Sequence, residues 1–176
     1  EDIAAEAMAE GIDWTWETFP EYLDTVEALP KGINYSGYVG HSALRTWAMG
    51  ERAFEEAATD DDLEIMEREL RDALRAGAIG LTTSRTFNHQ TSDDRPVASR
   101  LATWDEVTRL VGVMGDEGAG IFELANEDVL RDEERRSEYY SRLQALTLAT
   151  GIPITFGVAS GRFPKGEHRA VLDVLD

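Results

Sequence analysis

The sequence contains no cysteine, and this absence excludes several kinds of site. Without cysteine the chain forms no disulfide and binds no metal ion through thiolate ligands. Three catalytic motifs are also missing: a His-x-His pair, a His-Glu-x-x-His helix and a Gly-x-Ser-x-Gly turn. The first two would indicate a metal site and the third a serine nucleophile. The spaced glycines Gly37-x-x-Gly40 and Gly77-x-x-Gly80 are much weaker signals than a dinucleotide-binding motif.

Lysine is scarce, since only Lys31 and Lys165 occur. The 17 basic residues face 35 acidic ones, which gives a formal net charge of −18. This charge argues against nucleic acid and anionic membrane surfaces as partners. Many acidic residues with few lysines suit a salty cytoplasm, and a GC-rich genome would favour arginine over lysine in the same way; the sequence does not separate these two explanations.

Long hydrophobic runs are absent too: none reaches the roughly 20 residues of a membrane-spanning helix, and no signal-peptide pattern is visible. We therefore expect a cytoplasmic protein without membrane partners. The chain begins at Glu1 without methionine, and both of its ends fall within helix-like patterns. We therefore expect residues 1–176 to be a single segment of a longer domain.

The residues that are present predict an α/β fold. Hydrophobic residues make up 42% of the chain, as in soluble globular proteins. Short apolar stretches predict four buried strands, and the segments between them have helical spacing. Thr59 and Thr103 are good helix N-caps, and Thr103 forms a capping-box pattern with Glu106. The strands are expected at residues 34–39, 79–83, 120–125 and 152–158, and the main helices at residues 17–29, 59–76, 103–118 and 132–150.

No hairpin signal separates the four strands, so we expect them to be parallel and buried on both faces. The joints from helix to strand are tight, whereas the connections from strand to helix are long and polar. This asymmetry predicts that the functional site lies at the carboxyl ends of the strands. A (β/α)8 barrel needs about 250 residues, or about 30 for each unit. The four units here therefore predict about half of a (β/α)8 TIM-type barrel, or a complete four-stranded sheet if nothing is missing.

The segment from Ala76 to Ser99 contains the best candidate for a site. It runs through a predicted strand into a long polar loop, and loops of this length in compact domains are usually functional or disordered. In this loop we expect His89 and Asp93 to be catalytic, through proton transfer or orientation of the imidazole. Arg85 and Ser92 are expected to bind substrate, with Arg85 contacting a carboxylate.

Candidate residues also follow the first and third predicted strands. His41 and Arg45 come directly after the first strand, where the chemistry of barrels is located, and we expect both to bind substrate. Glu123 and Asn126 lie near the end of the third strand, where Glu123 would serve as a base or a ligand, or form a salt bridge at the rim. His168 lies near the last predicted helix and is interpreted as structural.

Several spaced motifs, taken in order, resemble one family. They are Trp14-x-Trp16-x-x-Phe19-x-x-Tyr22-Leu23, Val39-Gly40-His41-x-x-Leu44-Arg45 with Met49-Gly50, and Ala76-Gly77-Ala78-x-Gly80-x-Thr82-Thr83. This order and spacing is similar to that of the N-acyl-D-amino-acid deacylases, which are the D-aminoacylases of the amidohydrolase superfamily. The central motif Ser84-Arg85-Thr86-x-x-His89-x-Thr91-Ser92-Asp93 resembles a branch described only as amidohydrolases. The resemblance covers nearly the whole chain.

The resemblance implies a metal-dependent hydrolase on a (β/α)8 barrel that cleaves a non-peptide C–N bond in a small N-acyl amino acid. In the family, a His-x-His pair and a cysteine lie upstream of this part and a metal-binding Asp lies downstream. The family also places histidines on the strands that match residues 120–126 and 153–160, where this chain has none. Zinc is therefore expected in the intact protein, with ligands mostly outside residues 1–176, and the fragment alone is expected to be inactive and without zinc.

Two other interpretations of the chain remain open. One is a non-catalytic, acidic α/β module for binding or self-association. The other is a receiver-type signalling domain, although the strand ends lack the acidic cluster and lysine of that class. In either the barrel or the module, the outer strands have unpaired N–H and C=O groups, so we expect a homo-oligomer.

Overall fold

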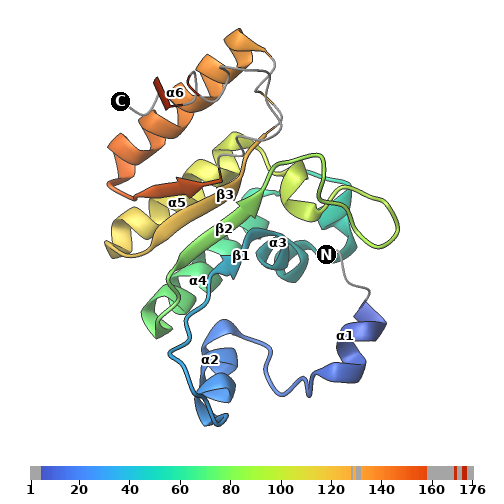
Figure 1. Ribbon diagram of the computed structural model, residues 1–176. Coiled ribbons are helices and arrows are strands. Elements are labelled where there is room, and N and C mark those ends of the chain that lie inside the picture. The colour runs from blue at the N-terminus through green and yellow to red at the C-terminus, as the bar shows by residue number, and fades with distance from the viewer. Residues whose placement is uncertain (1–4, 128, 130–131, 158–168, 170–171, 174–176) are drawn as a thin grey trace.

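Four parallel strands form one sheet, in the order β1-β2-β3-β4, in a computed structural model that describes residues 5–127, 129, 132–157, 169 and 172–173. The strands are β1 (Val39–Gly40), β2 (Gly80–Ser84), β3 (Ile121–Ala125) and β4 (Ile154–Phe156). Each strand pairs with the next one along the chain, as consecutive (β/α) units do in a barrel wall (Figure 1). The predicted parallel α/β fold is confirmed.

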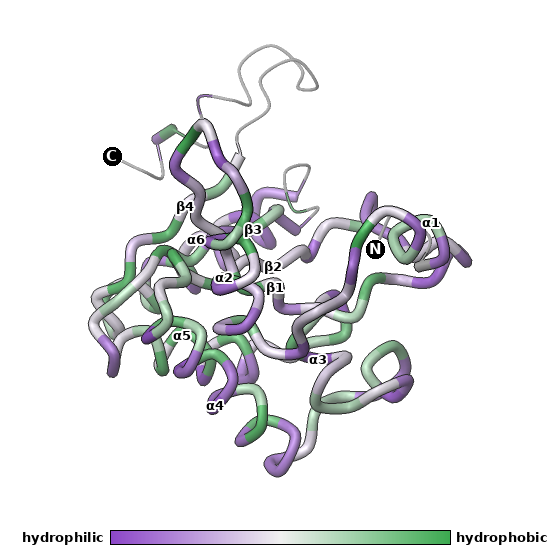
Figure 2. The backbone as a smooth tube through the Cα atoms, turned by 90° about the horizontal axis from the view of Figure 1, so that it is seen from below, coloured by the Kyte–Doolittle hydropathy of each residue, from purple (hydrophilic) through white to green (hydrophobic). Residues whose placement is uncertain are grey.

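Six α-helices connect or precede the strands in the described part of the chain. They are α1 (Ala5–Gly11), α2 (Phe19–Ala28), α3 (His41–Met49), α4 (Asp60–Ala76), α5 (Trp104–Glu117) and α6 (Glu133–Thr150). Short 3-10 helices, η1 (Gly50–Phe54) and η2 (Ala98–Leu101), lie in the connections. Figures 1 and 2 both place α4 and α5 on the same side of the sheet.

The core lies between the sheet and these helices because each strand turns alternate side chains toward them. Leu81 on β2 and Phe122 and Leu124 on β3 are buried against α4, α5 and α6. The residues between them, Thr82 and Glu123, are only half-buried, and they lie directly opposite each other in the register of β2 and β3. The sheet therefore has one apolar face that packs on helices and one face with polar side chains.

Helix α4 shows how local sequence sets these elements. The Thr59 hydroxyl accepts a hydrogen bond from the Asp62 backbone N–H, and the Asp62 carboxylate accepts one from the Thr59 backbone N–H, so both ends of a capping box are formed. Leu63, Met66, Leu70 and Leu74 form an apolar stripe at helical spacing, and all four are buried. Figure 2 shows the corresponding alternation of hydrophobic and hydrophilic residues along this helix. Its C-cap is Gly77 in the left-handed conformation.

Gly80 permits the close approach of β2 and β3. Its φ of +148° is one that residues with a side chain rarely adopt, and a Cβ at this position would lie 1.9 Å from the carbonyl oxygen of Ile121. A larger residue would therefore push the two strands apart at their amino ends, where Gly80 pairs with Ile121.

The first strand is much shorter than the sequence predicted. We expected a strand over residues 34–39, but only Val39–Gly40 pairs with β2, and residues 33–36 are exposed. In the described residues β1 has a partner on one side only, so the β-favouring pattern of this segment has no second neighbour with which to pair. Residues 160–166, which the sequence indicates as a polar loop, and His168 lie outside the described residues, and only residues 169 and 172–173 of the last predicted helix are described.

Candidate functional site

A pocket of about 340 Å³ lies at the carboxyl ends of β1, β2 and β3. Its lining includes two of the predicted site residues, His41 and His89, together with Glu123 and several hydroxyl side chains: Ser42, Thr82, Thr83, Ser84 and Ser99. Parallel α/β folds bind their ligands at this end of the strands. Arg45, Arg85, Ser92 and Asp93 are not in the described lining.

His41 belongs to a buried polar cluster beneath the pocket. Its Nε2 lies 2.7 Å from Oε1 of Glu106, and its Nδ1 lies 2.9 Å from the hydroxyl of Thr83. Arg45 donates to the second oxygen of Glu106, and it also donates to the carbonyl oxygens of Ala53 and Glu56. His41, Arg45 and Glu106 are each at most 1% exposed, so this cluster ties α3 to α5 in the interior.

The protonation of this cluster follows from its burial and charges. Burial lowers the pKa of His41 below its ordinary value of 6.5, and the hydrogen bond to Glu106 only partly opposes this. Burial raises the pKa of Glu106, but the hydrogen bonds from His41 and Arg45 outweigh it, so the net shift is downward. The carboxylate is therefore paired with Arg45 while His41 stays neutral. Neutral His41 then donates a hydrogen bond from Nε2 to Glu106 and accepts a hydrogen bond from the Thr83 hydroxyl at Nδ1.

The capping box that the sequence predicted between Thr103 and Glu106 is only half formed. Thr103 does accept a hydrogen bond from the Glu106 backbone, as expected. The Glu106 side chain, however, turns inward to His41 and Arg45 instead of back to the Thr103 N–H. His41 and Arg45 together bind the inward-facing carboxylate much more strongly than one backbone N–H would. One signal in the sequence was available: Glu106 precedes Val107 and Leu110 on the buried face of its helix.

His89 is held over the pocket by Ser84 at the end of β2. The Ser84 hydroxyl and His89 Nδ1 are 2.7 Å apart. Ser84 is anchored in turn, because Ser99 donates its hydroxyl to the Ser84 carbonyl at 2.9 Å, and Ser99 also bonds Ser42. No partner of His89 Nε2 occurs among the described residues, so this is the nitrogen that the loop leaves for a ligand.

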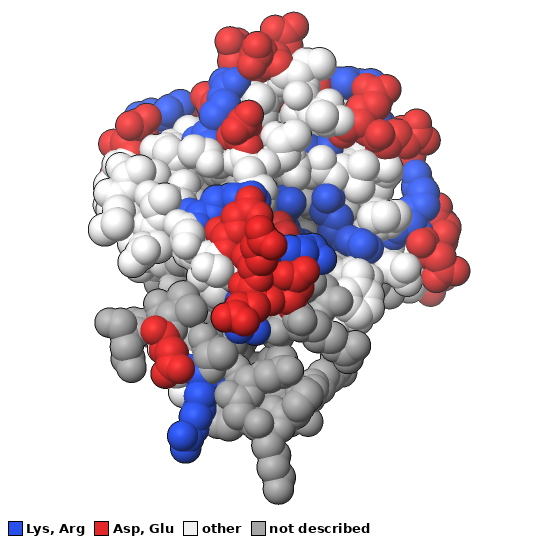
Figure 3. Space-filling model, turned by 90° about the horizontal axis from the view of Figure 1, so that it is seen from above, with Lys and Arg blue, Asp and Glu red and all other residues white. Residues whose placement is uncertain are grey.

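The other predicted loop residues have partners of their own. Arg85 donates to Glu127 at 2.6 Å and to the carbonyl of Ala102, and its guanidinium lies 5.1 Å from the centre of the Trp104 ring. Asp93 accepts from Thr91 and pairs with Arg95 at 2.8 Å, while Ser92 is exposed. Figure 3 shows the wider pattern, with acidic and basic side chains adjacent on the face seen from above. Arg85, His89 and Asp93 therefore contact three different sets of residues, and their predicted roles stay predictions.

Glu123 is the carboxylate of the pocket lining. Its neighbours in register are Thr82 on β2 and Thr155 on β4, which place hydroxyl side chains on both sides of it. Tyr38 faces it from the segment before β1: burial raises the pKa of Tyr38, and the negative charge of Glu123 raises it further. The pocket thus combines an imidazole, a carboxylate and several hydroxyls, which is a set suited to moving protons and to binding polar groups.

The residues of the pocket do not by themselves fit a catalytic zinc ion, which normally takes three protein ligands. The part of the chain that the structure describes contains no group of three His, Asp, Glu or Cys side chains able to hold a metal. Both ring nitrogens of His41 are already hydrogen-bonded, which leaves His89 Nε2 and Glu123 as donors toward the pocket. Any zinc site here would need ligands from beyond these residues.

Comparison with known proteins finds no matching family model. Curated relatives are found, however. A D-aminoacylase of Alcaligenes xylosoxydans xylosoxydans is 32% identical over 115 residues, which are 65% of this chain and 21% of that protein. An uncharacterised protein of Mycobacterium tuberculosis is 35% identical over 111 residues, which are 59% of this chain and 18% of the relative. The chain thus spans about a fifth of the length of these relatives.

Solved structures share the fold over most of the chain. A copper complex of a D-aminoacylase mutant superposes with a TM-score of 0.68 at 24% identity, covering 89% of this chain and 30% of the other. N-acyl-D-glutamate deacylase from Bordetella bronchiseptica, in complex with zinc and a phosphonate inhibitor, has a TM-score of 0.65 at 22% identity and covers 90% and 31%. The described sheet therefore corresponds to part of their barrel-like fold. The predicted resemblance is confirmed: this chain is similar to the D-aminoacylases in sequence and to D-aminoacylase and N-acyl-D-glutamate deacylase in fold.

Proposed function

We propose that the chain forms about half of the catalytic barrel of a metal-dependent amidohydrolase that cleaves the C–N bond of an N-acyl amino acid. The observation that carries the proposal is the position of the pocket. Its imidazole and carboxylate, from His89 and Glu123, lie at the carboxyl ends of parallel strands in a chain similar to D-aminoacylases. Residues 1–176 would then be one segment of this domain, with the zinc ligands mostly beyond it.

In this proposal His89 transfers the proton that amide hydrolysis requires. The leaving amine must gain a proton as the C–N bond breaks, and imidazole is the side chain that gains and loses one near neutral pH. Ser84 bonds Nδ1, so Nε2 is the atom that would deliver the proton. Thr82 and Glu123 would bind polar groups of the substrate, while Arg85, Ser92 and Asp93 would act at the rim. His41 and Arg45 would support the pocket from beneath through Glu106.

The test uses the longer gene product that contains this chain, assayed with a panel of N-acetyl-D-amino acids that includes N-acetyl-D-glutamate. We expect hydrolysis, and we expect His89→Ala to lower kcat by about 10²- to 10⁴-fold, the usual contribution of a general acid. Asn88→Ala, a change of the exposed neighbour in the same loop, is the matched control and should keep full activity. Equal activity of the His89 variant and the parent would remove His89 from the mechanism. Absence of hydrolysis across the panel would favour the non-catalytic binding module.

Two further properties belong to the proposal. We place the protein in the cytoplasm; none of its described helices is long and apolar enough to cross a membrane. We also propose that the 176-residue chain self-associates, because β1 and β4 are the outer strands of the sheet and each pairs on one side only among the described residues. Light scattering should then give a mass above 19.6 kDa at micromolar concentration, and the mass of one chain would refute self-association.

A further inference from the structure

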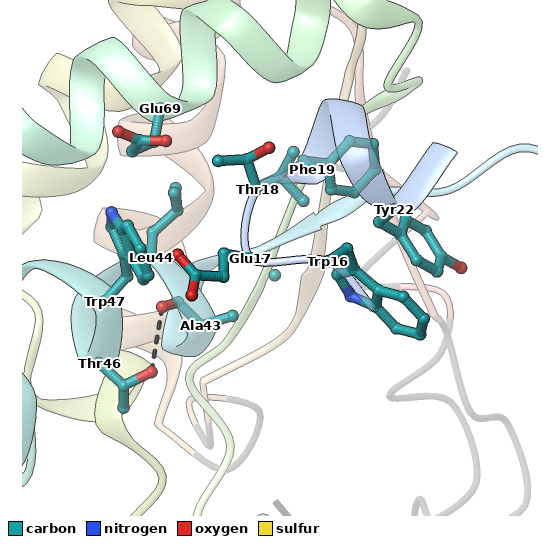
Figure 4. A pocket seen from close by; sticks show the side chains of 12 residues that line it. Trp16, Glu17, Thr18, Phe19, Tyr22, Ala43, Leu44, Thr46, Trp47 and Glu69 are labelled. Carbon is teal, nitrogen blue, oxygen red and sulfur yellow. Dashed lines mark hydrogen bonds between the residues drawn. The ribbon is translucent and has the colours of Figure 1, made fainter. Parts of the chain in front are cut away.

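A second cavity, of about 440 Å³, lies between α2, α3 and α4 and is also lined by Val39 and Gly40 of β1. Its walls are aromatic. Trp16, Phe19 and Tyr22 line it from α2 and the residues before it, and Trp47 lines it from α3 (Figure 4). Trp16 and Phe19 both contact the ring of Tyr22, with centroids 5.3 and 5.5 Å apart. The volume is within the range of small-molecule sites, which is roughly 300 to 1,000 Å³.

Trp47 is partly exposed at the wall of this cavity. It is 52% exposed although it lies on a helix whose opposite side carries the buried His41 and Arg45. A half-exposed indole at the wall of a cavity offers an apolar face that a ligand can contact. Figure 4 shows Trp47 on one side of the cavity and Trp16 on the other. A ligand between them would contact an aromatic face on each side.

The charged side chains of the lining are both acidic. Glu17 and Glu69 line the cavity, and no basic residue is among its described lining. In Figure 4 the Glu17 side chain lies between the two tryptophans, and Glu69 reaches in from α4. The Glu17 carboxylate has no hydrogen-bond or ion-pair partner in the described part of the chain. Arg68 contacts only Oε1 of Glu69, at 3.1 Å, and the Arg68 side chain is 61% exposed, so the charge of Glu69 is weakly compensated.

Indole faces with nearby carboxylates recognise one class of ligand. The face of an indole attracts a cation, and tryptophan does so best among the aromatic residues. Two carboxylates strengthen this attraction and repel anions. We propose that the cavity binds a small organic cation of the alkylammonium class, with its charged head between Trp16 and Trp47 and near Glu17 and Glu69. This site shares only Gly40 with the described lining of the pocket at the strand ends, and the proposal does not depend on the amidohydrolase activity.

The experiment compares choline with 3,3-dimethylbutan-1-ol, its uncharged isostere of almost the same shape. Binding is followed by the indole N–H signals of the four tryptophans in two-dimensional NMR of the chain. We expect choline to shift the signals of Trp16 and Trp47 in a saturable way. Trp104, which lines a different region and lies against Arg85, serves as the internal reference. The neutral isostere should bind at least about fivefold more weakly, since it lacks the cation–π attraction. Equal binding of both compounds would overturn the proposal.

Two variants separate the parts of the site. Trp47→Leu keeps an apolar side chain and removes the aromatic face, so it should weaken choline binding about fivefold and weaken binding of the isostere less. The double variant Glu17→Gln and Glu69→Gln should weaken choline binding about tenfold. Glu64→Gln, which changes an exposed carboxylate on the same helix outside the cavity, should have no effect. Choline binding that is unchanged in both site variants would place the ligand elsewhere.

The same titration by calorimetry on the longer gene product tests whether the site exists in the whole protein. Retained choline binding supports the proposal. Binding that occurs in the 176-residue chain and disappears in the longer protein would overturn it, because the remaining polypeptide would then fill the cavity.

Discussion

The two described histidines, His41 and His89, lie at the ends of neighbouring strands and have opposite environments. His41 is 1% exposed, with Glu106 and Thr83 on its two ring nitrogens. His89 is half-buried in a loop, with Ser84 on Nδ1 and no described partner on Nε2. The first is built into the framework and the second is presented to the pocket. Both histidines line the pocket, but only His89 keeps a ring nitrogen without a partner among the described residues.

The largest expected effect is a loss of stability when the buried cluster of His41, Arg45 and Glu106 is broken. Glu106→Ala removes the carboxylate and leaves the positive charge of Arg45 buried without its partner, which should cost about 3–5 kcal/mol of unfolding free energy. Asp105→Asn changes the exposed acidic neighbour on α5 and should cost less than about 0.5 kcal/mol. Urea denaturation followed by circular dichroism measures both. A cost for Glu106→Ala close to that of the control would mean that the cluster does not hold α3 against α5.

The next effect is a dependence of stability on pH that comes from His41. Its folded pKa is lowered, so below 6.5 the unfolded chain binds protons that the folded chain refuses. Stability should therefore fall as the pH decreases from about 6.5, by at most about 1.4 kcal/mol for each pH unit. Glu106, whose pKa is also lowered, should add a further loss below its ordinary value of 4.5. Denaturation curves at pH 7.5, 6.5 and 5.5 measure the slope.

Two variants assign that slope to one histidine. His41→Gln should flatten the dependence between pH 7.5 and 5.5, because the glutamine does not titrate. His89→Gln should keep the slope of the parent. A slope that disappears in the His89 variant and persists in the His41 variant would reverse the assignment of the two environments.

The smallest effect on stability is expected from changes to His89 and to Ser84, its hydrogen-bond partner. His89→Ala removes a half-buried ring with one hydrogen bond to Ser84, so it should cost about 1 kcal/mol or less. Ser84→Ala should cost a similar amount and also shift the imidazole NMR signals of His89, whereas Ser137→Ala, an exposed serine on α6, should leave them unchanged. The chain has three histidines, which makes the assignment simple. A cost of several kcal/mol for His89→Ala would mean that His89 belongs to the framework like His41.

The sequence predicted well the elements that local interactions determine, and less well those that depend on distant segments. The predicted strand at 79–83 is found as Gly80–Ser84, and the predicted helix start near Asp132 is found with Asp132 as N-cap. These elements depend on caps, glycines and apolar stripes within a few residues of each other. The strand at 34–39 was predicted too long, because the length of a strand depends on which neighbours pair with it.

The site shows the same division. The order of elements predicted that His41 and His89 lie at the carboxyl ends of the parallel strands, and both line the pocket there. The role of Glu106 did not follow, since it is separated from His41 by 65 residues and meets it only because α3 and α5 pack on the same face of the sheet. Ser84, Ser99 and Ser42 were missed as a chain of hydrogen bonds for the same reason.

The sequence by itself therefore determined the parallel α/β architecture, the ends of most helices and the edge of the sheet at which the site lies. Periodicity and capping are short-range and are encoded in neighbouring residues. The tertiary structure alone decided which histidine is sealed and which is presented to the pocket. That decision depends on burial and on charged partners brought together from distant segments, and both the cost of burying a charge and the strength of a buried ion pair are set only by the folded environment.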